Sequence, residues 1–232
     1  MKTIGLIGGM SWESTITYYK LLNEKANQRL GGLHSATILV HSLDFAPIAK
    51  MQYEGRWDEA SVALTQAALS LEHTGAELIL LCTNTMHKVL PFISPYLKTP
   101  LLHIAEAAAI ALKKSNVKNV LLFGTKFTMQ EPFYKEILSF HDIKVMLPNL
   151  EEIEAINRII YDELCVGKIV TSSREYFLQL IEKYKNAHPE LDGVVLGCTE
   201  IGMLLEPGCA ALPLFDTTVI HVEEALNMAL KD

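Results

Sequence analysis

The sequence lacks an excess of basic residues, a long apolar run and closely spaced cysteines. Its 20 lysines and arginines are outnumbered by 27 aspartates and glutamates, for a formal net charge of −7. Because binding to nucleic acid needs a basic face, this charge argues against nucleic acid as the main partner. No apolar run is long enough to span a bilayer, so we expect no membrane partner.

A secretory signal and a disulfide framework are lacking too. The apolar stretch within residues 1–9 is too short for a signal peptide, and Trp12 and Glu13 follow at once. Wide spacing is typical of reduced thiols, and it holds for all four cysteines: Cys82, Cys165, Cys198 and Cys209. We therefore expect a cytoplasmic protein.

Motifs that indicate a cofactor are also absent. Gly5-x-x-Gly8-Gly9 does not match the dinucleotide fingerprint, and Asp44 lacks the rest of that signature. There is no P-loop lysine and no Ser-His-Asp order with a nucleophile elbow. No C-x-x-C or H-x-x-x-H spacing favours a metal. We expect neither a cofactor nor a metal ion.

The sequence does contain a regular alternation of buried strands and helices. Apolar runs predict strands at residues 3–8, 36–43, 77–81, 120–123, 144–147, 193–197 and 211–215. Periodicity predicts helices at 11–28, 57–73, 104–113, 127–140, 151–165, 171–187 and 217–230, and another that stops before Pro91. This alternation indicates βαβ units, and therefore an α/β fold with mostly parallel sheets flanked by helices.

Several helix details follow from single residues. Gly75 predicts the end of the helix at 57–73. Thr171 or Ser172 predicts the N-cap of the helix at 171–187, and Asp216 that of the last helix. One face of the helix at 11–28 is predicted to carry Trp12, Ile16, Tyr19, Leu22 and Ala26.

The chain contains an internal repeat. Residues 4–9 align with 120–125, and residues 81–85 align with 196–200, at nearly equal spacing. The repeat predicts two pseudo-symmetric lobes, the first formed by residues 1–100 plus 211–232 and the second by 101–210. The alternative is that any two βαβ units look alike. If the lobes are real, their strand ends face each other across a cleft, the usual place for a small-molecule site.

The repeat pairs Cys198 with Thr83, not with Cys82. Cys82 corresponds to Gly197 and points to the other side of its strand, so we expect a buried, inert thiol. Cys198 precedes a predicted helix start at Thr199, where a thiol has a lowered pKa and is available as thiolate. The alternative, a cysteine that only packs at a tight turn, stays open on local sequence alone.

Polar residues around the strand ends suit a small anion. Backbone N–H groups at Gly8, Gly9 and Met10 would form a carboxylate site at a helix start. Glu200 is the one acidic group there and is suited to pair with an ammonium group. Side-chain donors come from Asn84, Thr85, Thr125, Thr128 and Thr199. The alternative is that these side chains only cap helices.

Taken together, Gly8-Gly9-Met10, T-N-T-x-H at 83–87 and G-C-T-E at 197–200 resemble the aspartate/glutamate racemase family. The likeness covers nearly the whole chain, including residues 102–105. It implies two pseudo-symmetric α/β lobes with the active site in the cleft between them, and a homodimer. It also implies racemisation without pyridoxal phosphate or metal. Two cysteines flank the substrate α-carbon in this family; one thiolate removes the α-proton, and the other thiol returns a proton to the opposite face.

This sequence departs from the family motif C-N-T-x-H, because Thr83 precedes Asn84. The family's second cysteine matches Cys198. The resemblance assigns the α-carboxylate to Asn84, Thr85 and Thr199 with the Gly9-Met10 turn, and it places Gln52 and Lys168 toward the side-chain carboxylate.

A hydroxyl is a far weaker acid than a thiol. We therefore predict a racemase of aspartate or glutamate in which Cys198 acts well on the L-enantiomer and Thr83 acts poorly on the D-enantiomer. The alternatives are a racemase of another amino acid, a dicarboxylate isomerase or decarboxylase, and a non-catalytic binder of acidic metabolites.

Overall fold

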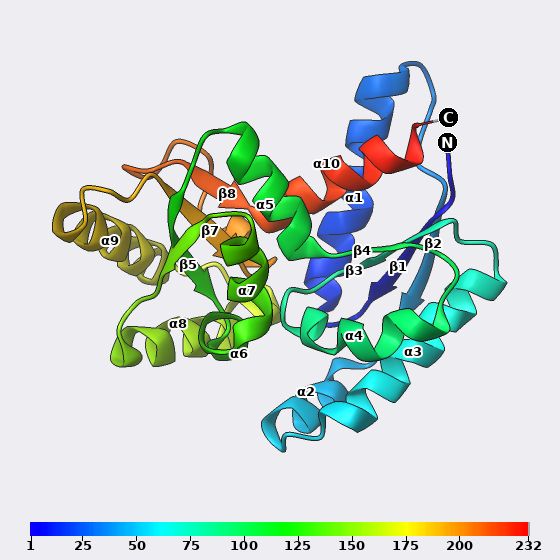
Figure 1. Ribbon diagram of the computed structural model, residues 1–232, viewed down its shortest axis with the longest axis horizontal. Helices are drawn as coiled ribbons and strands as arrows, with labels where there is room; N and C mark the ends of the chain where they lie inside the picture. The colour runs from blue at the N-terminus through cyan, green and yellow to red at the C-terminus, as the bar shows by residue number, and fades with distance from the viewer. Residues whose placement is uncertain (232) are drawn as a thin grey trace. The chain divides into compact units, whose positions relative to one another are not determined.

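The computed structural model describes residues 1–231, which form two compact units. The first unit comprises residues 1–103 and the chain from His221 onward, and the second comprises Ile104–Ile220. Each unit contains a four-stranded sheet in which every pairing is parallel (Figure 1). The predicted α/β fold with two parallel sheets is confirmed.

The first unit has the strand order β2-β1-β3-β4. Its strands are β1 (Ile4–Gly8), β2 (Ile38–Ser42), β3 (Leu78–Leu81) and β4 (Leu101–Leu102). Its helices are α1 (Trp12–Leu30), α2 (Phe45–Tyr53), α3 (Trp57–His73), the 3₁₀ helix η1 (Thr85–Val89), α4 (Leu90–Ile93), the 3₁₀ helix η2 (Ser94–Tyr96) and most of α10 (Thr217–Ala229).

Helices cover both faces of this first sheet (Figure 1). On one face Leu6 and Leu80 pack against α1 and α10, and on the other Ile7 and Leu81 pack against α2, α3 and α4. A strand covered on both faces is apolar at every position instead of alternating. All five residues of β1 and all four of β3 are accordingly buried.

The second unit has the matching strand order β6-β5-β7-β8. Its strands are β5 (Asn119–Gly124), β6 (Lys144–Met146), β7 (Gly193–Gly197) and β8 (Leu214–Asp216). Its helices are α5 (Ile104–Lys114), α6 (Lys126–Gln130), α7 (Pro132–Phe140), α8 (Leu150–Asp162), η3 (Leu164–Val166), α9 (Thr171–Ala187) and η4 (Ile201–Met203). Because the two strand orders match, β1 corresponds to β5 and β3 corresponds to β7, as the repeat predicts.

The boundary between the units differs from the expected one. We predicted that residues 211–232 join the first lobe. In the structure β8 pairs with β7, with Val194 opposite Leu214, so residues 214–216 complete the second sheet. The chain returns to the first unit only at His221, inside α10.

The predicted face of α1 is wrong in part. Its buried residues are spaced four apart: Ser14, Tyr18, Leu22 and Ala26. Trp12, Ile16 and Tyr19 are 56%, 53% and 55% exposed. The prediction assigned the large apolar side chains of α1 to the buried face, but that face includes a serine and an alanine.

The two tryptophans both lie in the first unit. Trp12 is the exposed residue that begins α1. Trp57 begins α3, and the Lys88 ammonium lies 3.7 Å from the centroid of its ring, a cation–π geometry.

Several helix boundaries also differ from the prediction. α2 was not predicted, although Asp44 caps it by accepting a hydrogen bond from the Ala46 N–H at 3.2 Å. Pro91 lies in the first turn of α4 and does not end a helix. Pro132 divides the predicted helix at 127–140 into α6 and α7, because proline suits the first turn and not the interior.

The predicted caps give a mixed result. Asp216 accepts from the Thr218 N–H at 2.8 Å, and Gly75 follows α3 at φ +100°, so both predictions are confirmed. The N-cap of α9 is Val170, without a side-chain hydrogen bond, so the prediction of Thr171 or Ser172 is wrong.

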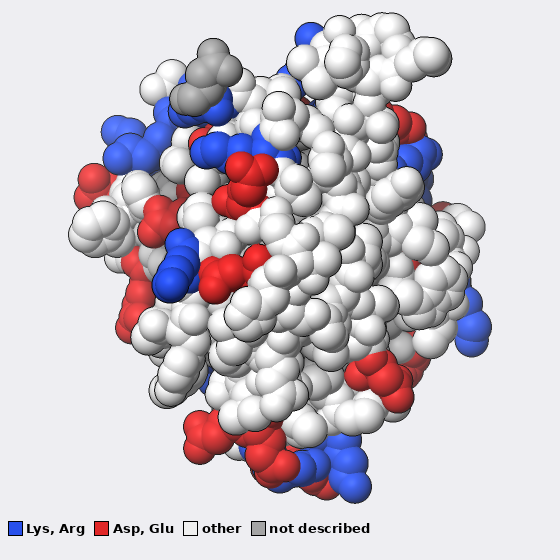
Figure 2. Space-filling model, turned by 90° about the vertical axis from the view of Figure 1, so that its right-hand side faces the viewer, with Lys and Arg blue, Asp and Glu red and all other residues white. Residues whose placement is uncertain are grey.

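The charged side chains are mixed in sign on the face shown in Figure 2, where blue and red groups lie around an uncharged middle. Among residues 1–231, no helix combines the length and the apolar character needed to cross a membrane.

Candidate functional site

The carboxyl edge of the first sheet gathers the first group of predicted site residues. β1 and β3 are neighbours, with Ile7 opposite Leu81, so the segments that follow them leave the sheet at the same edge. Five predicted site residues at this edge are buried: Gly9, Met10, Thr83, Asn84 and Thr85. The last four are 3–8% exposed.

Two backbone contacts shape this edge. The Gly9 N–H donates to the Thr15 hydroxyl at 2.8 Å, so that amide is already used within the unit. The Thr83 carbonyl lies 2.8 Å from Nδ1 of His87, one turn later on η1. The T-N-T-x-H spacing therefore places the histidine where it holds the backbone of Thr83.

Cys82 lies on the other side of its strand and is confirmed as a buried thiol. Its side chain is fully buried and belongs to the apolar cluster with Tyr18 and Leu22. Burial raises the pKa of its thiol, so Cys82 stays protonated.

Gln52 is buried on α2 in the same unit, and its amide donates to the Met86 sulfur at 2.9 Å. This contact ties α2, the helix that sequence reasoning missed, to η1.

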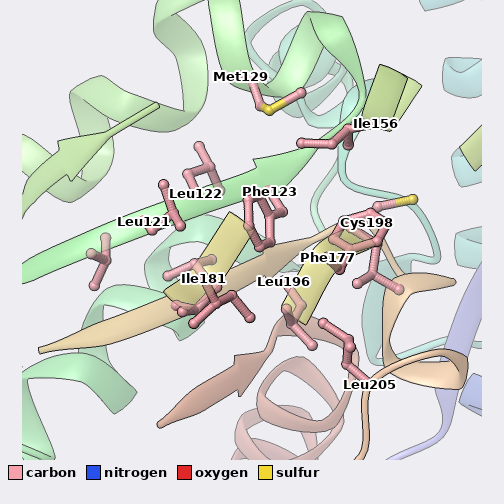
Figure 3. Close-up of a cluster of buried hydrophobic side chains, with 14 of the residues drawn as sticks. Leu121, Leu122, Phe123, Met129, Ile156, Phe177, Ile181, Leu196, Cys198 and Leu205 are labelled. Atoms are coloured by element: carbon pink, nitrogen blue, oxygen red, sulfur yellow. The ribbon is translucent and has the colours of Figure 1, made fainter. Parts of the chain in front are cut away.

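The carboxyl edge of the second sheet gathers the other group. β5 and β7 pair through Gly124 and Gly197, so Thr125 and Cys198 follow adjacent strand ends. Figure 3 shows Cys198 at the end of β7 in the apolar cluster with Leu196 and Phe177. Cys198, Thr199 and Glu200 are 5%, 3% and 3% exposed.

Thr125 caps a helix, which the sequence analysis gave as the alternative to binding a small anion. It is the N-cap of α6, where its hydroxyl accepts from the Thr128 N–H at 3.3 Å, and the two hydroxyl oxygens lie 3.2 Å apart. Lys168 is exposed, in the loop after η3.

Donors converge on the Glu200 carboxylate. Its Oε2 accepts from the Thr199 hydroxyl at 2.6 Å and from the Cys198 thiol at 3.0 Å. Its Oε1 accepts from the Cys165 thiol at 3.8 Å. The predicted pairing of Glu200 with a substrate ammonium stays a prediction. In the structure the Glu200 oxygens accept hydrogen bonds from the two thiols and the hydroxyl.

The expected lowering of the Cys198 pKa is wrong for the structure as it stands. Burial and then the Glu200 carboxylate raise the pKa of this thiol well above its usual value. The helical element that directly follows β7 is the three-residue η4, which is too short to provide a macrodipole that favours the thiolate.

Sequence reasoning missed Cys165 and a histidine cluster in which His87 and His221 are buried and His103 is partly buried. The rings of His87 and His103 lie 4.7 Å apart, and those of His87 and His221 lie 5.8 Å apart. His221 Nε2 donates to the Leu102 carbonyl at 3.1 Å, so its Nδ1 accepts from the Tyr18 hydroxyl at 2.7 Å. His87 lies inside the T-N-T-x-H motif and His103 inside the matched stretch 102–105, so the sequence offered a signal for two of the three histidines.

The described chain, residues 1–231, holds no group of three or more histidine, cysteine or acidic side chains placed to bind a metal ion.

Comparison with known proteins identifies relatives of this chain. The sequence profile of the Asp/Glu/hydantoin racemase family matches residues 7–225. A broad-specificity amino-acid racemase, RacX of Bacillus subtilis, is 24% identical over 232 residues, which cover 98% of each chain.

Two solved structures match over the full length of both chains. A putative Asp/Glu racemase from Yersinia pestis is 46% identical with a TM-score of 0.90. An aspartate racemase homologue from Pyrococcus horikoshii is 35% identical with a TM-score of 0.87.

The histidine cluster predicts a loss of stability in acid. Burial lowers the pKa of His221 to about 3 and of His103 to about 4, and it lowers that of His87 as well. Below pH 6.5 these three histidines bind protons in the unfolded chain but remain neutral in the folded chain. The free energy of unfolding should therefore fall as the pH drops from about 6.5 to about 4, by at most about 1.4 kcal/mol per pH unit for each histidine.

Urea unfolding at several pH values measures this slope. His103→Gln should reduce this slope by about the contribution of one histidine, because the variant has one group fewer that binds a proton only in the unfolded chain. Equal slopes in the wild-type chain and this variant would contradict the assignment.

Proposed function

Because the chain belongs to the Asp/Glu/hydantoin racemase family, we propose that it racemises an acidic amino acid, aspartate or glutamate, without a cofactor. The observation that carries the proposal is Cys198, held at the carboxyl end of β7 in a G-C-T-E motif beside a proton acceptor. The names of the Yersinia pestis and Pyrococcus horikoshii proteins support the acidic substrate class.

In the proposed reaction Cys198 and Thr83 act on opposite faces of the substrate α-carbon. Cys198 acts in this step as the thiolate, after its own proton has left: its sulfur takes the α-proton of the L-enantiomer, the C–H bond breaks, an S–H bond forms, and the electron pair stays on the α-carbon. The Thr83 hydroxyl then gives a proton to the other face. We assign the substrate α-carboxylate to Asn84, Thr85 and Thr199, and its side-chain carboxylate to Gln52 and Lys168.

A second candidate is a racemase of other amino acids. It is favoured by the relative from Bacillus subtilis, whose name gives a broad specificity. A dicarboxylate isomerase or decarboxylase and a non-catalytic binder are further alternatives that the same experiment separates.

The first prediction is exchange of the substrate α-proton in deuterated water across a panel of L- and D-amino acids. L-aspartate or L-glutamate should exchange fastest. Cys198→Ala should lower this exchange by about 10³-fold or more, because the base is lost. Cys209→Ala is the matched control, since that partly buried thiol has no role in the reaction.

Folded protein that exchanges no amino acid would contradict the proposal. Ligand-induced stabilisation that survives Cys198→Ala without any exchange would instead identify a binding protein. Exchange confined to other amino acids would select the second candidate.

The second prediction concerns Thr83→Cys. A thiol is a far better base than a hydroxyl, so this variant should raise exchange of the D-enantiomer by roughly 10²-fold and leave L-exchange within a few-fold. Chiral chromatography of both directions measures the change. An unchanged rate on the D-enantiomer in a folded variant would remove Thr83 from the mechanism.

We also propose that the protein is a cytoplasmic homodimer, in which the four free thiols stay reduced. Sedimentation equilibrium should give twice the 25.9 kDa chain mass. A single-chain mass at micromolar concentration would contradict the dimer.

A further inference from the structure

The backbone around Thr83, after β3, is held by three hydrogen bonds within the first unit. The Thr83 N–H donates to the Leu81 carbonyl at 2.9 Å, and the Ser14 hydroxyl donates to the Cys82 carbonyl at 2.7 Å. The Thr83 carbonyl lies 2.8 Å from Nδ1 of His87. Only this last contact comes from a side chain within the T-N-T-x-H motif, so the motif supplies its own support for Thr83.

The tautomer of His87 follows from this contact. A carbonyl oxygen can only accept a hydrogen bond, so Nδ1 carries the proton and donates it to the Thr83 carbonyl. Burial, and then the neighbouring rings of His103 and His221, lower the pKa of His87 well below its usual value, which favours the neutral ring. The single N–H of that neutral ring is thus committed to Thr83.

The His87 contact also influences where the Thr83 hydroxyl lies. His87 follows Thr83 by four residues, on η1, and its side chain is 1% exposed, so the ring has little room to move. Threonine is β-branched and stiff at χ1, so the backbone position of Thr83 largely determines where its hydroxyl points. Without the His87 donor a buried carbonyl would lose its partner, and the segment would shift to recover one.

We propose that His87 is a positioning residue for Thr83, because it holds the segment after β3 so that the Thr83 hydroxyl lies where a proton is delivered to the substrate α-carbon. This role rests on the proposed function, which is what gives Thr83 that step. No bond of the His87 ring forms or breaks in the reaction, and Nδ1 keeps its proton. His87 should therefore affect delivery of the proton and leave its removal, assigned to Cys198, unchanged.

Two substrates separate removal of the proton from its delivery. Conversion of L-aspartate to D-aspartate needs both steps, because an α C–H bond breaks on one face and forms on the other. β-Chloro-L-aspartate needs only the first: its α-proton passes to sulfur, the electron pair forms a double bond between the α- and β-carbons, and chloride leaves. The ratio of the racemisation rate, from chiral chromatography, to the rate of chloride release measures delivery alone.

His87→Leu removes the donor and should lower this ratio by roughly 10²-fold, the loss expected when a reacting group moves by about 1 Å. His87→Asn should restore it to within about threefold of the wild-type value, because an amide nitrogen bonded to Cγ, as Nδ1 is, can donate to the same carbonyl. His87→Gln carries its amide one methylene further out. It should behave like His87→Leu, and it replaces that variant if the leucine variant does not fold.

The matched control is His221→Asn. His221 Nε2 donates to the Leu102 carbonyl at 3.1 Å, so this variant also removes a histidine donor from a backbone carbonyl, but not from Thr83. Its amide oxygen can still accept from the Tyr18 hydroxyl, which now donates to Nδ1 at 2.7 Å. The ratio should keep its wild-type value. An equal fall in folded His221→Asn would show that His87 has only a structural role and would overturn the proposal.

The hydrogen bond itself is tested without any substrate. Nuclear magnetic resonance of isotope-labelled histidine should show His87 with Nδ1 protonated and Nε2 bare from about pH 6 to about pH 8. A bare Nδ1 would overturn the proposal. An unchanged ratio in folded His87→Leu or His87→Gln, in a chain whose wild type racemises aspartate, would overturn the positioning role alone. A wild-type chain that acts on neither substrate would instead contradict the proposed function, and the role of His87 would fall with it.

Discussion

The close approach of β5 and β7 at their carboxyl ends is the constraint on which the second unit's chemistry depends. Gly124 and Gly197 are paired there, and a Cβ at either would lie 2.8 Å from a backbone carbonyl oxygen of the other strand. Only glycine permits this contact. The strands therefore end side by side, and the residues that follow, Thr125 and Cys198, start from fixed neighbouring positions.

The first unit uses a comparable device at the end of β1. A Cβ at Gly8 would lie 2.5 Å from the Thr15 side chain. Gly9 has φ +88°, and a Cβ there would lie 2.0 Å from the Leu43 carbonyl oxygen. In both units, strands buried on two faces deliver polar residues into surroundings that exclude water. That exclusion lowers the pKa values of the histidines and raises those of the thiols, so it favours neutral histidines and protonated thiols.

Much of this fold follows from the sequence because strands covered on both faces are apolar without interruption. The run at 78–81 and the run ending at Gly197 therefore indicate their own boundaries, and the repeat separates Thr83 from Cys82. Burial of individual side chains is harder to predict. Trp12 is exposed because a serine and an alanine share the inward stripe of α1. The direction of the Cys198 pKa depends on desolvation and on the Glu200 contact, and Cys165 approaches Glu200 from 35 residues away, a contact that no local pattern encodes.

The position of Trp12 and Trp57 has a consequence for spectroscopy. Both indoles belong to the first unit, one at the surface and one beneath the Lys88 ammonium, and the chain contains no other tryptophan. Intrinsic fluorescence thus reports directly on the unit that carries Thr83, while the unit that carries Cys198 has no indole of its own. Emission and far-ultraviolet circular dichroism would follow different denaturation curves wherever the two units unfold separately, which makes the native chain its own optical probe of cooperativity.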